Sequence, residues 1–71
     1  MVWFYERSGR FIRCESRQAE KGAGYELVVM YPDGREDIET FEDPVELNRR
    51  QLQLEHELSA GGWFGPHGRI V

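Results

Sequence analysis

The sequence predicts an α+β fold, an antiparallel β-meander of about four strands in two hairpins, with one C-terminal α-helix packed on one face. Two apolar-rich segments each contain a turn signal, Ser8-Gly9 in the first and Pro32-Asp33-Gly34 in the second. A helix-start signal, Asp43-Pro44-Val45-Glu46, follows the second segment. With 71 residues, the chain is expected to form a single small domain, 1–71.

The first predicted hairpin joins an aromatic-rich strand, residues 2–7, to an alternating apolar and polar strand, residues 10–16. Because side chains alternate along a strand, a two-residue loop at Ser8-Gly9 determines which of them share a face. That face is expected to carry the cross-strand pairs Trp3 with Cys14 and Tyr5 with Ile12. Residues 18–24 contain two glycines and no strand pattern, so we expect a loop there.

The second predicted hairpin joins residues 25–31 to a return strand that ends at Phe41. Pro32 suits the second position of a type I turn and Gly34 a positive-φ position, so we expect a four-residue loop, Pro32 to Arg35. The expected cross-strand pairs are Val29 with Ile38 and Leu27 with Thr40.

This even-length loop is preferred because of the charges on the return strand. It gives an apolar face made of Tyr25, Leu27, Val29, Tyr31 and Ile38. An odd-length loop would instead turn Asp37 and Glu39 toward that face, where a buried carboxylate costs several kcal/mol unless it is paired.

The predicted helix begins with Asp43 as N-cap and Pro44 at the first helical position, and Glu46 three residues after the cap completes a capping-box pattern. Gly61-Gly62 is expected to end it. Leu47, Leu54 and Leu58 fall on one narrow arc, which we expect to cover the apolar face of the sheet. Residues 61–71 are expected to form a non-helical tail whose Trp63 and Phe64 fold back onto the sheet or the helix edge.

Composition argues against several functional classes. Cys14 is the only cysteine, which excludes an intramolecular disulfide and suits a reducing compartment, so a cytoplasmic location is expected. The start of the chain lacks a signal-peptide pattern, and no segment has the ~20 apolar residues of a membrane span. His56 and His67 are far apart on the predicted elements, and no catalytic residue, metal site or cofactor site is predicted. The protein is expected not to be an enzyme.

The side of the sheet that faces away from the helix is the candidate functional surface. Its predicted residues are Val2, Phe4, Phe11, Arg13, Val28 and Met30. Such a surface is typical of a protein partner site or a homodimer contact. Aromatic side chains next to arginine are also found in single-strand nucleic-acid binders, which is the alternative function. A third outcome is that the tail covers this face, or that its apolar side chains are only scattered exposed residues.

Nucleic acid is the less favoured partner because of the charge balance. The net charge is −4, with ten acidic and four basic residues in 25–71. The element order is similar to that of some small DNA-binding domains, such as integrase N-terminal and plant transcription-factor modules. Their sheets are basic, whereas the predicted face here carries several acids. We therefore expect contact with another protein or with a second copy.

Overall fold

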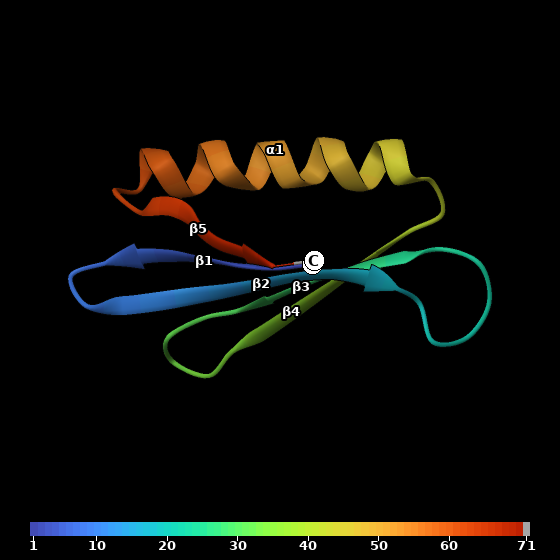
Figure 1. Cartoon of the computed structure of the whole chain (residues 1–71), viewed down its shortest axis with the longest axis horizontal. Helices are drawn as coiled ribbons and strands as arrows, with labels where there is room; N and C mark the ends of the chain where they lie inside the picture. The colour runs from blue at the N-terminus through green and yellow to red at the C-terminus, as the bar shows by residue number, and fades with distance from the viewer. Residues whose placement is uncertain (71) are drawn as a thin grey trace.

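Five antiparallel strands form one sheet in the computed structural model, which describes residues 1–70 and the side chains of residues 1–68. The elements are β1 (Val2–Arg7), β2 (Arg10–Gln18), β3 (Tyr25–Met30), β4 (Glu36–Phe41), α1 (Pro44–Ala60) and β5 (Phe64–Ile70). The spatial order of the strands is β4-β3-β2-β1-β5. Figure 1 shows α1 lying along one side of this sheet. The predicted α+β class, with one helix on an antiparallel sheet, is confirmed.

The strand count is five rather than the predicted four, because most of the predicted tail forms β5. This strand pairs antiparallel with β1 and is the edge of the sheet on that side. Its register is irregular: Phe4 lies opposite His67 and Glu6 opposite Phe64, so two steps on β1 match three on β5. The two glycines and the proline of this segment hid its strand character. Val71, the last residue of the predicted tail, lies outside the described residues.

The first hairpin has the predicted register. Trp3 pairs with Cys14 and Tyr5 with Ile12, and all four side chains are buried on the helix side. Ser8 and Gly9 both have positive φ values, 53° and 77°, as a two-residue hairpin turn of type I′ requires.

The predicted register of the second hairpin is wrong. Leu27 pairs with Glu39 and Val29 with Asp37, while Ile38 lies opposite Val28 and faces away from the helix. The loop has three residues rather than four, since Tyr31 N–H donates to the Arg35 carbonyl at 2.8 Å.

Turn chemistry explains this odd-length loop. Gly34 N–H donates to the Tyr31 carbonyl at 2.9 Å, and Gly34 has a φ of 90°. Asp33 Oδ1 accepts from Arg35 N–H at 2.9 Å. A four-residue turn whose last residue is a left-handed glycine is the usual form of a three-residue hairpin loop. Pro-Asp-Gly therefore determined the register, and the apolar pattern of β4 did not.

An ion pair to the helix compensates for the inward-facing carboxylate. Arg50 of α1 donates through Nε to both Glu39 carboxylate oxygens, at 3.0 and 3.1 Å, and its Nη1 lies 3.5 Å from Glu57 Oε2. Asp37 stays exposed, because β4 is an edge strand. The burial cost that argued against this register is thus largely avoided.

We expect this ion pair to stabilise the fold measurably. A double-mutant cycle with Glu39→Ala and Arg50→Ala should give a coupling of about 1 kcal/mol, at the upper end for half-exposed pairs. Urea unfolding of the four proteins measures it. Arg49→Ala on the exposed side of the same helix is the matched control, and coupling of Arg49 to Glu39 of equal size would contradict the assignment.

The helix begins and ends as predicted. Asp43 Oδ1 accepts a hydrogen bond from Val45 N–H at 2.8 Å, and Pro44 is the first helical residue. At the other end, Gly62 N–H donates to Ser59 and Trp63 N–H donates to Leu58, the two hydrogen bonds of a Schellman cap. The helix has 17 residues. No helix within residues 1–70 is long and apolar enough to cross a membrane.

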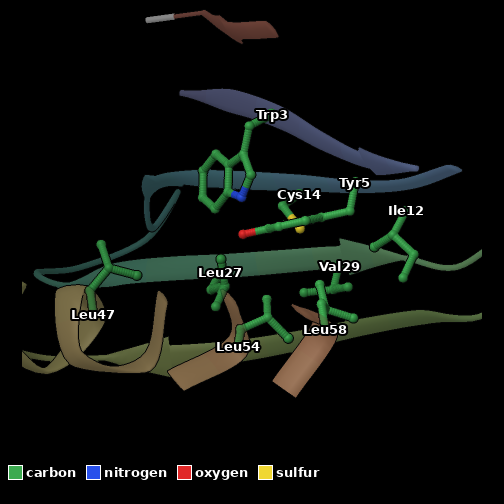
Figure 2. Packing of buried hydrophobic residues seen from close by; sticks show 9 residues of the cluster. All are labelled: Trp3, Tyr5, Ile12, Cys14, Leu27, Val29, Leu47, Leu54 and Leu58. Carbon is green, nitrogen blue, oxygen red and sulfur yellow. The ribbon is translucent and has the colours of Figure 1, made fainter. Parts of the chain in front are cut away.

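The core lies between α1 and the sheet, as Figure 2 shows. Its buried side chains are Trp3, Tyr5, Ile12, Cys14, Leu27, Val29, Leu47, Leu54 and Leu58. All except Ile38 of the predicted apolar faces either belong to this cluster or pack against it. The predicted leucine stripe is therefore confirmed, and the error in β4 costs the core one side chain.

Candidate interaction surface

The side of the sheet away from α1 is called the open face below. Figure 1 shows the helix on the other side, and residues 1–70 contain no second helix. Because side chains alternate along each strand, the neighbours of the core residues point to the open face. These are Val2, Phe4, Glu6, Phe11, Arg13, Glu15, Arg17, Glu26, Val28, Met30, Glu36, Ile38 and Thr40, with Phe64 and His67 from β5.

Two cross-strand rows occupy the middle of the open face. The Arg13 row reads Glu36, Met30, Arg13, Phe4 and His67 across the five strands. The Glu15 row, one step along, reads Ile38, Val28, Glu15 and Val2 from β4 to β1. In both rows the central strand β2 carries a charged residue, and apolar side chains lie on either side of it.

Several large apolar side chains on this face are exposed to solvent. The exposed fractions are 55% for Phe11, 50% for Ile38, 67% for Phe64 and 37% for Met30. Val28 is different, with only 4% exposed. Phe11 and Phe64 both lie beside Glu6 at one end of the face, whereas Ile38 lies across the sheet on β4. Apolar groups that are exposed on one face of a small protein mark interaction sites.

Ion pairs join the charged side chains in the centre of the open face. Arg13 Nη1 lies 3.3 Å from Glu15 Oε1, and Arg17 Nη1 lies 3.6 Å from the same oxygen. Arg17 Nε donates to Glu26 Oε1 at 3.0 Å, and this hydrogen bond raises the pKa of the Arg17 guanidinium above its ordinary value. The face thus has alternating, mutually paired charges along β2.

A shallow apolar depression lies at the β5 side of the open face. It is lined by Phe4, Glu6, Phe11, His67 and Gly68. A Cβ atom at Gly68 would lie 3.8 Å from Phe4 Cδ2, so the glycine keeps a side chain off the Phe4 ring. An aromatic or aliphatic side chain of a partner fits such a depression.

The structure places all six predicted surface residues, Val2, Phe4, Phe11, Arg13, Val28 and Met30, on the open face. Two exposed apolar residues of this face were missed, Ile38 and Phe64. The three-residue loop that Pro-Asp-Gly favours would have found Ile38. No sequence signal identifies Phe64, because its orientation depends on the pairing of β5 with β1. Residues 64–70 of the tail, which form β5, lie beside β1 at the edge of the sheet and not over the open face.

The single thiol lies in the core. Burial raises the pKa of Cys14 from 9.0 to about 12, and the nearby Arg13 charge lowers it by a smaller amount. At pH values below 9 the thiol is therefore neutral in both the folded and the unfolded chain. As the pH rises from about 9 to about 12, only the unfolded thiol ionises, so the contribution of Cys14 to folding stability falls.

The two histidines lie on different surfaces. His56 is exposed on the outer side of α1, and His67 is exposed on the open face. In the described part of the chain, no group of three or more His, Cys, Asp or Glu side chains is placed to hold a metal ion.

Both edges of the sheet are poor templates for strand addition. The β4 edge carries three acidic residues, Glu36, Asp37 and Glu39. The β5 edge contains Pro66, which has no N–H group, and is irregular in register. Charged residues, prolines and bulges at edge strands prevent pairing with another chain. The open face is therefore the more accessible route to association.

Comparisons with protein-family models, curated proteins and solved structures found no match. Functional conclusions therefore depend on the chemistry of the open face.

Proposed function

We propose that this is a small non-catalytic protein that acts through protein–protein contact, with the open face as its contact surface. The observation that supports this function most strongly is the exposure of Phe11, Ile38 and Phe64 on one side of the sheet. A single helix covers only the other side, so these side chains remain in water unless a partner covers them. The buried, neutral thiol of Cys14 fits a non-catalytic, cytoplasmic role.

Nucleic acid has less support as the partner. Arg13 and Arg17 are the only basic side chains of the open face as defined above, apart from a histidine, and both pair with glutamates of the same face. Four glutamates lie there against these two arginines: Glu6, Glu15, Glu26 and Glu36. A phosphate backbone binds unpaired, clustered basic residues, and this face does not present them.

Site-specific photo-crosslinking tests the contact function. A photoreactive amino acid at position 11 is expected to capture protein in cells that express the chain, because Phe11 is 55% exposed and lines the apolar depression of the open face. The same group at position 52 is the matched control, since Leu52 is about as exposed but lies on α1, on the other side of the sheet. Ile38→Ser should reduce capture at position 11. Equal capture at both positions, or none at position 11, would contradict the proposed surface.

A further inference from the structure

The pattern of charges on the open face is complementary to itself. This pattern indicates which partner the face binds. Resting on the contact function proposed above, we infer that the open face docks onto the open face of a second copy of this chain. The twofold axis crosses the strands between the Arg13 row and the Glu15 row. Each β2 then lies over the β2 of the second copy, running in the opposite direction.

The order of charges along β2 selects this axis. A twofold axis running along β2 would place Arg13 over Arg13 and Glu15 over Glu15, and one running between β2 and a neighbouring strand would place the charges of β2 over apolar side chains. An axis crossing the strands at either row would again bring like charges together. The axis between the rows places each Arg13 over Glu15 of the second copy, and such charge matching determines register in interfaces.

The same axis also brings some of the apolar side chains together. Phe4 of one copy lies over Val2 of the other on the β1 side of the charged strand, and Met30 lies over the row of Val28, which is itself only 4% exposed, on the β3 side. At the β4 edge the axis places Ile38 over Glu36 of the second copy. Phe11 lies over Arg17 of the second copy, where a guanidinium can stack on the ring. An axis one step further along β2 would also match charges, as Glu15 over Arg17. It would, however, place Val28 over Glu26 and move Phe4 and Met30 away from the centre.

Aligned packing of two sheets is compatible with this arrangement. Packed sheets are rotated by about 30° because of their twist, which displaces residues far from the axis and leaves those beside it superposed. Arg13 and Glu15 are adjacent to the axis. The competing route, pairing of sheet edges, is disfavoured by the acids of β4 and by Pro66 in β5.

The size of the face indicates how tight the dimer is. Five strands spaced ~4.8 Å apart and six residues long at ~3.3 Å each cover roughly 20 Å by 20 Å. This footprint, roughly 400 Å² on each copy and roughly 800 Å² in total, is below the about 1,200 Å² or more that stable specific interfaces bury. We therefore expect a reversible dimer whose population rises with protein concentration.

Charge exchange tests the arrangement. Arg13→Glu places two acidic side chains at the centre of the face, and Glu15→Arg places two basic ones there. The dissociation constant of the dimer should therefore be larger by about tenfold or more for each single variant than for the wild type. An equimolar mixture of the two should form a heterodimer, since both new contacts are attractive. The double variant, which also keeps the ion pair within each chain, should dimerise as the wild type does. Sedimentation velocity over a concentration series, with one variant carrying a mass tag, measures all four cases.

Circular dichroism melts of each variant show whether it is folded. If a single charge variant is unfolded, Met30→Glu replaces it: this change leaves the ion pairs in place and sets a carboxylate over Val28 of the second copy. Weaker dimerisation of Met30→Glu supports the arrangement, and unchanged dimerisation overturns it.

Two results separate this inference from the contact function on which it rests. A wild-type chain that stays monomeric at millimolar concentration, while position 11 still captures another protein in cells, overturns the homodimer and keeps the contact function. A wild-type dimer that the single charge variants do not weaken, or that the mixture does not restore, overturns the proposed axis. Absence of both self-association and capture overturns the contact function as well.

Discussion

Replacing Leu54 by alanine is expected to lower the free energy of unfolding by about 3 kcal/mol, within the range for leucines in protein cores. Leu54 is only 3% exposed and lies in the cluster between α1 and the sheet. The loss combines the transfer of the missing methyl groups with the cavity left behind. A domain of 71 residues has a stability of about 4–10 kcal/mol, so this one change removes a large part of it.

Urea unfolding followed by circular dichroism measures this loss. Leu52→Ala is the matched control on the same helix, because Leu52 is 59% exposed, and it should change stability by less than about 0.5 kcal/mol. Equal losses for the two variants would show that the helix does not pack on the sheet through the Leu47, Leu54 and Leu58 stripe.

Replacing Gly65 by alanine is expected to destabilise the fold by about 3 kcal/mol, because steric overlap and backbone strain act together. A Cβ atom at this position would lie 2.7 Å from the Phe4 carbonyl oxygen and 2.7 Å from Tyr5 Cδ1. Neither the backbone of β1 nor the buried Tyr5 ring can move freely. Gly65 also has a φ of 154°, which side chains rarely adopt. The variant should loosen the pairing of β5 with β1.

Thermal unfolding and amide hydrogen exchange measure this effect. The expected fall in Tm is more than about 10 °C for a domain of this size, with the largest loss of exchange protection in β5. Gly22→Ala is the matched control: Gly22 has a φ of 86° but nothing within 4 Å of the added Cβ, so only the backbone cost of about 1 kcal/mol remains. A Gly65→Ala variant no less stable than Gly22→Ala would mean that β5 does not approach β1 this closely.

Much of the fold could be predicted because its signals are local. The turn at Ser8-Gly9 and the alternation around it determine which side of β1 and β2 is buried. The Asp43 cap and the spacing of the leucines determine the start of α1 and its buried side. All six predicted surface residues followed from the alternation of side chains along β1, β2 and β3. The side to which these residues point does not depend on the register of β4.

Residues distant in the sequence decided the rest. The Pro-Asp-Gly turn favours an odd-length loop, but that register is tolerated only because Arg50, eleven residues after Glu39, reaches across from the helix to pair with it. The tail becomes a strand only because β1 offers a free edge and Gly65 lets the two backbones meet. Local propensity therefore determines each hairpin and the helix, whereas the burial of a carboxylate and the fit of an edge strand depend on groups that only folding brings together.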